Sequence, residues 1–359
     1  EELAYYNNTY LNQGLNVYTS FNQDYQKVVE KSASEYTKDS KVETSSIVVE
    51  PYTSKILAII GGKDYASSQF NRATQANRQI GSTIKPLLYY LALENGFTPA
   101  TTFLCEPTTF KLDDNSTYSP SNFNDKYAYK DVTLAQAIAV SDNIFAVKTH
   151  LFLGTDNLAS LIKKFGIKDV KANASLALGT LNTNIYNLAN MYNCLASEGK
   201  YNHLYTIEKI TNDDGKVLYQ HEQEDKQLLE QDSCLELSQL LTSTFNSTFS
   251  TYLQATMASY QLDNINACKT GSTDVDNLAV AYNPQVLVAS WVGYDDNRKM
   301  ETADDKTVAK KTVIDVLNYT NENKDVTWYQ PTEDLQQIAI NPLTGDFDEN
   351  GTVYWFKKD

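Results

Sequence analysis

Two pairs of short apolar segments, one near each end of the 359-residue chain, constrain the fold most strongly. Residues 47–49 and 56–60 flank a polar stretch that contains Pro51, and residues 278–282 and 286–292 flank a stretch that contains Pro284. Short apolar runs separated by turn-forming residues are typical of β-hairpins. The sequence therefore predicts one hairpin near each end.

The chain between these hairpins carries helical patterns. Residues 83–93 and 134–140 are rich in apolar side chains, and Asn95-Gly96 supplies a stop signal for the first of these helices. Strands at both ends with helices between them favour an α+β domain whose sheet closes across the sequence.

The two ends of the chain are interpreted separately. Residues 15–19 predict a short strand, and Asn22 is a suitable N-cap for the helix that follows. The polar residues 32–45 are typical of a linker. The tail from residue 326 onward predicts a further hairpin around residues 343–345.

Charge and composition exclude several classes of function. The formal net charge is −15 and there is no basic block, so a nucleic-acid partner is not expected. No segment approaches the roughly 20 apolar residues of a membrane-spanning helix. The cysteines show no metal-ligand spacing; four could form two disulfides, but widely separated cysteines are more often free and buried. The histidines are expected in loops or at the surface. These residues are Cys105, Cys194, Cys234 and Cys268, and His150, His203 and His221.

The pattern S-x-x-K occurs three times, at Ser82/Lys85, Ser160/Lys163 and Ser197/Lys200. The second and third copies fit a solvated helix face. The first opens a helix that continues with almost wholly apolar residues, which predicts burial. Its spacing places the serine hydroxyl and the lysine amine on one face of the helix. A lysine can accept the serine proton if burial or a neighbouring cation lowers its pKa.

Two further motifs can complete such a site. Ser141-Asp142-Asn143 interrupts two apolar helical stretches, and a buried polar break of this kind needs hydrogen-bond partners. Lys269-Thr270-Gly271 begins the C-terminal strands, and Ser272 follows it. Glycine at this position allows a ligand to approach the backbone closely. A second S-x-N sequence, at Ser20 and Asn22, is interpreted as a helix cap.

The order S-x-x-K, S-D-N, K-T-G is found in β-lactamases and penicillin-binding proteins. The flanking segments 61–73, 120–123, 133–137, 175–179 and 291–296 make the chain resemble the transpeptidase domain of class A, bifunctional penicillin-binding proteins. The resemblance covers roughly residues 14–296. It implies the serine β-lactamase/D,D-transpeptidase-like fold, in which a five-stranded antiparallel sheet is covered by helices beside a mainly helical lobe.

The resemblance also implies roles for the motif residues. Ser82 attacks the D-Ala-D-Ala carbonyl of a peptidoglycan stem peptide, and Lys85 takes its proton. Ser141 relays this proton to the departing D-Ala. Asn143 holds the substrate amide and Lys85.

The remaining implied roles belong to the K-T-G strand. Lys269 recognises the terminal carboxylate and keeps Lys85 neutral, while the Thr270 and Ser272 hydroxyls bind the same carboxylate. Gly271 gives the ligand access to the backbone. The backbone N–H groups of Ser82 and Ser272 form the oxyanion hole. No metal or cofactor is implied.

The family organisation implies three parts of the chain. Residues 1–45 are expected to be the linker from a glycosyltransferase domain that this sequence lacks, residues 46–325 the penicillin-binding transpeptidase domain, and residues 326–359 a C-terminal extension. The expected partners are stem peptides, the lipid-linked precursor and β-lactam antibiotics. A membrane anchor ahead of the linker would hold the enzyme at the extracytoplasmic face of the bacterial plasma membrane.

This sequence departs from the family pattern at a few positions. Ser272 replaces a threonine and so keeps the hydroxyl, and Cys268 stands where glycine is common. Asp142 is more typical of β-lactamases, and residues 242–259 lack the usual Gly-Thr-Ala-type pattern.

Three other functions share the motifs. A class A β-lactamase needs the glutamate of E-x-x-L-N, and no Leu-Asn pair in this chain has a glutamate three residues before the leucine. A β-lactam-sensing domain would lack the class A flanks. A D,D-carboxypeptidase, in which water replaces the acceptor amine, is the nearest alternative, because the acceptor depends on the shape of the groove.

Overall fold

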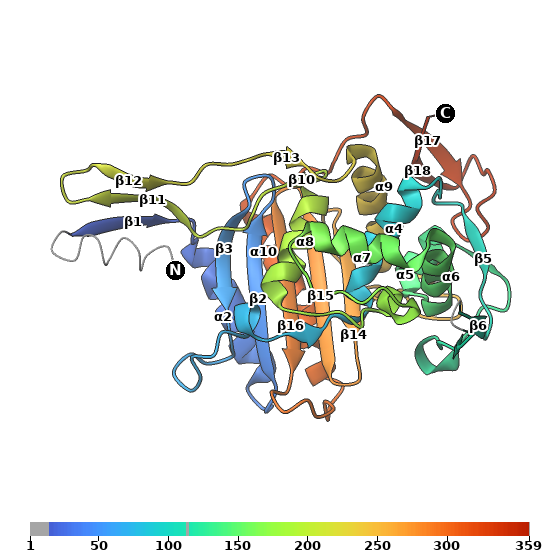
Figure 1. The fold of residues 1–359 in the computed structure, drawn as a ribbon, viewed down its shortest axis with the longest axis horizontal. Helices are drawn as coiled ribbons and strands as arrows, with labels where there is room; N and C mark the ends of the chain where they lie inside the picture. The colour runs from blue at the N-terminus through green and yellow to red at the C-terminus, as the bar shows by residue number, and fades with distance from the viewer. Residues whose placement is uncertain (1–13, 113–114, 359) are drawn as a thin grey trace.

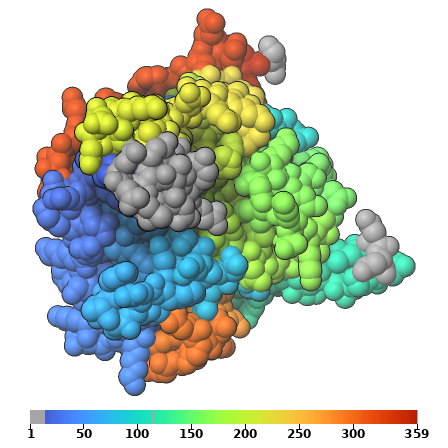
Figure 2. Space-filling view, turned by 60° about the vertical axis from the view of Figure 1, so that its left-hand side comes forward, coloured from blue at the N-terminus to red at the C-terminus, as the bar shows by residue number. Residues whose placement is uncertain are grey.

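A computed structural model describes residues 14–112 and 115–358, and its centre is a five-stranded antiparallel sheet (Figure 1). The strand order is β14 (Ala267–Ser272), β15 (Asp276–Asn283), β16 (Val286–Gly293), β2 (Glu43–Glu50) and β3 (Lys55–Ile60). Both predicted hairpins are confirmed, and they join where β16 pairs with β2. The early and late parts of the chain therefore form one body, as the space-filling view also shows (Figure 2).

Alternating side chains give the sheet two buried faces. Ile47 and Val49 of β2 belong to one hydrophobic core, whereas Val48 points into the other. Helices α2 (Gln23–Thr37) and α10 (Val308–Asn323) pack on the Val48 face, and α8 (Ile185–Ala196) packs on the opposite face. The expected α+β fold is confirmed.

A helical lobe lies beside the β14 edge (Figure 1). Its helices are α4 (Lys85–Glu94), α5 (Leu134–Val140), α6 (Asn143–Leu153), α7 (Thr155–Lys164) and α9 (Gln231–Leu241). Both predicted helices are confirmed, as α4 with the short 3₁₀ turn η1 (Gly81–Ile84) before it, and as α5. Pro86 is accommodated in the first turn of α4. No helix in the described part of the chain is long and apolar enough to cross a membrane.

The shorter elements connect the lobe to the sheet. The strands are β4 (Arg78–Gln79), β5 (Thr102–Leu104), β6 (Phe110–Lys111), β7 (Thr117–Tyr118), β8 (Asp131–Thr133), β9 (Asn182–Thr183), β10 (Lys200–Tyr201) and β13 (Lys226–Gln227). The short helical segments are α3 (Arg72–Gln75), η2 (Phe123–Asp125), η3 (Ala174–Leu178), η4 (Thr242–Phe245), η5 (Ser247–Phe249) and η6 (Asp305–Thr307).

The interpretation of residues 32–45 as a linker is wrong. Helix α2, capped by Asn22 as predicted, continues to Thr37, and β2 already begins at Glu43. The polar residues of this segment have partners, since Ser32 donates a hydrogen bond of 2.6 Å to Asp315 of α10. The prediction failed because α2 and α10 are joined here by hydrogen bonds between polar side chains, and a pattern of apolar residues does not reveal such contacts. The assignment of residues 1–45 to the connection with a preceding domain stays a prediction, and residues 1–13 lie outside the described residues.

Two peripheral hairpins extend the central body. The predicted strand β1 (Leu15–Thr19) is present and pairs with β11 (Ile207–Asn212), which continues to β12 (Val217–Gln220) in an arm that projects from the sheet (Figure 1). The predicted C-terminal hairpin is also present, formed by β17 (Leu335–Ile340) and β18 (Thr352–Lys357). It lies on α9, where the Trp355 N–H donates to Gln239.

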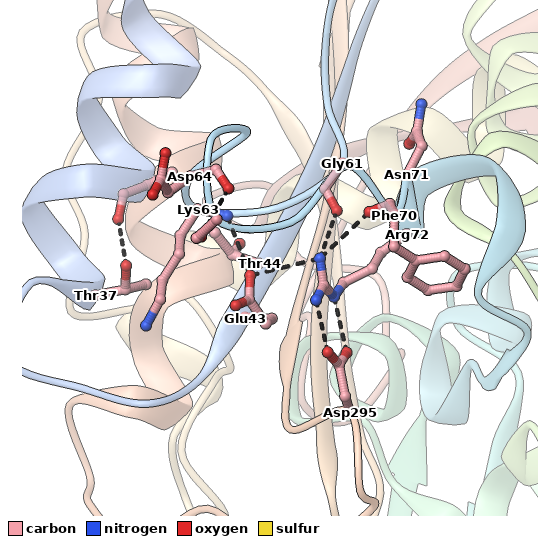
Figure 3. A network of polar contacts seen from close by, with 12 residues as sticks. Thr37, Glu43, Thr44, Gly61, Lys63, Asp64, Phe70, Asn71, Arg72 and Asp295 are labelled. Atoms are coloured by element: carbon pink, nitrogen blue, oxygen red, sulfur yellow. Dashed lines mark hydrogen bonds and ion pairs between the residues drawn. The ribbon is translucent and has the colours of Figure 1, made fainter.

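Arg72 attaches the segment that leads to Ser82 to Asp295, which follows β16 at the end of the sheet where β14 also ends (Figure 3). Its guanidinium donates two hydrogen bonds, of 2.8 and 2.6 Å, to the Asp295 carboxylate and one of 3.1 Å to the Gly61 carbonyl. A paired guanidinium and carboxylate of this kind fixes both position and direction. Arg78 forms a similar contact with Asp276, immediately after the K-T-G strand. The two arginines therefore fix the segment before Ser82 against the start of β15 and the residues that follow β16.

Two glycines also hold the chain before Ser82 in place, because their backbone approaches it closely. A Cβ atom added to Gly271 of β14 would lie 2.5 Å from the Ile80 carbonyl oxygen, and one added to Gly179 would overlap the Gly81 carbonyl. Gly179 also has a φ of +81°, in the left-handed region. The backbone of Gly271 and Gly179 therefore packs closely against the chain before Ser82 from two sides.

We predict that Gly179→Ala destabilises the domain much more than Gly96→Ala. Both glycines have a positive φ, which costs alanine about 1–2 kcal/mol, but a Cβ at Gly96 meets nothing within 4 Å. The overlap with Gly81 should add about 1–3 kcal/mol or more. Urea unfolding of the two variants measures the difference in the free energy of unfolding. Equal losses would show that the contact between Gly179 and Gly81 is not tight in solution.

Candidate active site

The three motifs predicted to act together converge on one cleft at the β14 edge of the sheet. The cleft has a volume of about 840 Å³ and lies between η1, the α5–α6 junction, β14 and the segment 253–260. Ser82, Ser141, Asn143, Thr270 and Ser272 line it. Lys85 and Lys269 lie beneath its surface, and neither side chain is exposed.

Ser82 occupies the second position of η1, directly before α4. Its side chain is half-buried and faces the cleft, and within the described part of the chain its hydroxyl makes no hydrogen bond. The glycine contacts on either side of η1 fix its backbone. Ser82 is therefore positioned rigidly, with its hydroxyl open to a ligand.

The Lys85 amine is surrounded by oxygen atoms of the second motif. Its Nζ donates hydrogen bonds to the Ser141 carbonyl at 2.8 Å, the Asp142 carbonyl at 3.1 Å and Asn143 Oδ1 at 2.8 Å, and contacts Ser141 Oγ at 3.3 Å. Burial lowers the pKa of Lys85 to about 7, although the charge of Asp142 opposes this shift. Near neutral pH this amine can therefore both accept and release a proton.

Ser141 links the two buried lysines. Lys269 Nζ donates to Ser141 Oγ at 2.8 Å and to the Thr270 carbonyl at 2.8 Å. A serine hydroxyl has two lone pairs and one proton, so Ser141 can accept from both amines while its own O–H points elsewhere. Burial, and after it the charge of Lys85, hold the pKa of Lys269 well below its ordinary value. The pair of amines therefore disfavours the state in which both are protonated.

Ser141 reaches this position through a strained turn. It ends α5 with a φ of +60°, in the left-handed region that non-glycine residues rarely adopt. This turn brings two successive carbonyl groups, those of Ser141 and Asp142, onto Lys85. The turn thus orients two carbonyl dipoles toward the Lys85 amine.

Asp142 organises this turn, and the partners expected for a buried Ser-Asp-Asn break are present. Its buried carboxylate caps α6 by accepting from the Phe145 N–H, and its second oxygen accepts from Cys105, Asn122 and Tyr252 at 3.0, 2.7 and 2.7 Å. A buried carboxylate is stable only with such a set of donors. The donors lie far apart in sequence, so no local pattern could have revealed the cluster.

Asn143 is held from two sides. Its Oδ1 accepts from Lys85, and its Nδ2 donates to the Ser121 carbonyl at 2.7 Å. Its backbone N–H donates to Asn122, which the Asp142 carboxylate fixes in turn. The expected contact between Asn143 and Lys85 is therefore present.

Beside the motifs, the segment 253–260 forms a wall of the cleft. The Thr256 N–H donates to the Ala139 carbonyl at 3.0 Å, which joins this wall to the end of α5. Tyr252 anchors the preceding residues on Asp142. The Ser/Thr-rich stretch 242–259, whose role the sequence left open, is thus part of the site.

The strand β14 presents Thr270 and Ser272 to the cleft. Ser272 Oγ donates to Asn277 Oδ1 at 2.8 Å, and its backbone lies against Gly81. Gly271 permits a close approach of the chain around Ser82, and its predicted role in admitting a ligand to the backbone stays a prediction.

The other candidates lie elsewhere. Ser160 and Lys163 are exposed, as expected, but the expectation of a solvated face is wrong for Ser197, which is buried and accepts from the Tyr52 N–H. His150 is also buried in α6 rather than in a loop. All four cysteines are free and buried, as predicted. In the described ranges no three His, Cys, Asp or Glu residues are grouped to hold a metal ion.

Solved structures with this fold include penicillin-binding protein 1A from Haemophilus influenzae. It has a TM-score of 0.79 and 22% sequence identity, over 88% of this chain and 53% of that chain. PonA1 from Mycobacterium tuberculosis has a TM-score of 0.78 and 21% identity, over 96% of this chain and 94% of that chain. These likenesses confirm the expected fold.

Sequence comparison extends this to the family. Penicillin-binding protein 2D of Bacillus subtilis is 38% identical over 92% of this chain and 49% of its own length. Penicillin-binding protein 1A of Aquifex aeolicus is 33% identical over 84% of this chain and 41% of its own length. The chain thus spans about half the length of these relatives. The penicillin binding protein transpeptidase domain matches residues 44–309, and the chain therefore belongs to this family of penicillin-binding transpeptidases.

Proposed function

We propose that this domain is a D,D-transpeptidase that cross-links peptidoglycan stem peptides through an acyl-enzyme on Ser82. Ser82 Oγ attacks the carbonyl carbon between the two terminal D-Ala residues, and Lys85 Nζ takes the hydroxyl proton. The C–N bond then breaks, and the departing D-Ala nitrogen receives a proton through the Ser141 hydroxyl. The amine of a second stem peptide attacks the ester, which forms the cross-link and restores Ser82.

The observation that carries this proposal is the shared hydrogen-bond network of Lys85, Ser141 and Lys269 beneath an unpaired serine hydroxyl. A serine becomes a good nucleophile only when a neighbouring group accepts its proton. A lysine whose pKa lies near 7 can do this at neutral pH. Proton transfer between Lys85 and the leaving group needs only the one intervening hydroxyl of Ser141.

The cleft also favours an amine over water as the acceptor. No aspartate or glutamate is among the described residues that line it. The nearest acid of the motifs, Asp142, is fully buried and already accepts four hydrogen bonds. Water therefore lacks a carboxylate base, in contrast to a class A β-lactamase. D,D-carboxypeptidase activity is the second candidate, because an open cleft also admits water.

The wider setting rests on the relatives. Since the chain covers about half of each of them, we propose that it is the transpeptidase part of a bifunctional cell-wall synthase. In that enzyme a glycosyltransferase domain would use the lipid-linked precursor, and an N-terminal anchor would hold both domains at the extracytoplasmic face of the membrane. β-Lactams would acylate Ser82 as analogues of the stem peptide, in keeping with a solved relative in complex with penicillin V.

Ser82→Ala should abolish covalent labelling by benzylpenicillin without unfolding the domain. Ser160→Ala is the matched control, because Ser160 belongs to an exposed copy of the same motif. Intact-mass spectrometry with peptide mapping measures the adduct. An adduct that persists in Ser82→Ala, or maps to Ser160 or Ser197, would contradict the assignment.

The acylation rate should depend on pH through Lys85. Protonated Lys85 cannot accept the Ser82 proton, so the rate should fall about tenfold per pH unit below a pKa of about 7 and level off above it. Stopped-flow measurement of labelling by a fluorescent penicillin from pH 5 to 9 gives the profile. A limb centred near pH 10, the value for a solvated lysine, would remove Lys85 as the base.

The penicilloyl-enzyme should be long-lived. The loss of a general base typically lowers a rate about 10²–10⁴-fold, and this cleft offers water no carboxylate. A chase with unlabelled drug after fluorescent labelling should show release over minutes to hours. Release within seconds would instead assign the protein to the β-lactamases.

A further inference from the structure

The cleft is cationic although the protein is strongly acidic. The formal net charge is −15, yet the charged residues among the described residues that line the cleft are Lys126 and Lys310. Lys126 is exposed at the lobe side, whereas Lys310 belongs to the first turn of α10 and is partly buried. The cleft is therefore suited to an anionic ligand.

Lys310 is held in place without a countercharge. Its Nζ donates a 2.9 Å hydrogen bond to the Thr256 carbonyl, and it forms no ion pair with any described acid. Burial lowers the pKa of Lys310. An ammonium has three N–H groups, so two remain for a ligand.

A second polar group in the same wall also lacks a partner. Thr256 Oγ1 is buried and makes no hydrogen bond within the described chain, although Thr256 lines the cleft. Buried hydroxyl groups are usually satisfied. Lys310 and Thr256 together thus leave hydrogen-bonding capacity for a ligand.

The family resemblance implies that Lys269 binds the terminal carboxylate of the substrate, but this amine is less available to a ligand than that of Lys310. Its side chain is fully buried, and its Nζ already donates to Ser141 Oγ and to the Thr270 carbonyl. Thr270, the residue after Lys269 on β14, lines the same cleft as Lys310. Lys310 is thus a cation that shares the cleft with the Thr270 hydroxyl.

We propose that Lys310, together with the Thr270 hydroxyl, binds the terminal carboxylate of the acyl donor, while Lys269 acts on Ser141. This inference rests on the proposed function and names the residue that selects its substrate. It separates two tasks that are often given to one lysine. Lys310 is a specificity-determining residue, and Lys269 controls the proton on the relay.

Lys310→Met tests this, because methionine keeps much of the apolar stem but removes the charge. The probes are benzylpenicillin and its methyl ester, which lacks the anionic carboxylate. In the wild-type protein the acid should acylate Ser82 faster than the ester. Lys310→Met should reduce this preference about tenfold to a hundredfold, the range for a lost hydrogen bond to a charged group. Intact-mass kinetics measures both rates.

The control variants are Lys310→Arg, which should largely retain the preference, and Lys306→Gln, which removes an exposed charge outside the cleft lining and should leave it unchanged. An unchanged ratio in Lys310→Met, or an equal slowing of both probes, would overturn the inference. The failure of both probes to acylate wild-type Ser82 would instead contradict the proposed function.

A measurement on the wild-type protein covers the case in which Lys310→Met does not fold. Acetic anhydride should label Lys310 less in the acyl-enzyme formed with benzylpenicillin than in the acyl-enzyme formed with the methyl ester, because a bound carboxylate protects the amine. Peptide mass mapping gives the extent of labelling. Equal labelling in the two acyl-enzymes would refute a contact between Lys310 and the carboxylate.

Discussion

Two lysine amines share one serine hydroxyl in a volume from which the protein has excluded water. Lys85 and Lys269 are fully buried, and both reach Ser141 Oγ. In water each amine would hold its proton until about pH 10, and a serine beside them would stay inert. Burial changes this balance, because a desolvated ammonium is costly and two adjacent ones are more so. The reactivity proposed for Ser82 depends on this constraint.

The rest of the structure keeps the buried amines in place. The strained turn at Ser141 directs two carbonyls onto Lys85, and the Asp142 carboxylate holds that turn through donors from three separate segments. On the opposite side, glycine contacts press η1 against β14. The ion pairs of Arg72 with Asp295 and of Arg78 with Asp276 fix the segment that leads to Ser82. Remote residues therefore contribute to the site by limiting its freedom to move.

The sequence predicted what depends on local pattern. Short apolar runs on either side of turn residues predicted both hairpins, and the three motifs identified residues that the structure brings to one cleft. Predictions from the sequence failed for residues whose burial depends on segments that are distant in the chain. Residues 32–45 resemble a linker because they are polar, but Ser32 and Tyr36 donate hydrogen bonds to Asp315 of α10. His150 is buried within α6, and Ser197 is buried at the C-cap of α8. The hydrogen bonds around Asp142 and the contact of Lys310 with the Thr256 carbonyl likewise form only when distant segments meet.

The most direct test of the central claim supplies the enzyme with a peptide ending in D-Ala-D-Ala and a D-amino acid as a simple acceptor. Mass spectrometry should detect release of D-Ala, a peptide acyl group on Ser82, and a product in which the acceptor has replaced the terminal D-Ala. The exchanged product should exceed the hydrolysed peptide when the acceptor is abundant. Hydrolysis alone would identify a carboxypeptidase, and turnover in Ser82→Ala would contradict an acyl-enzyme on Ser82 altogether.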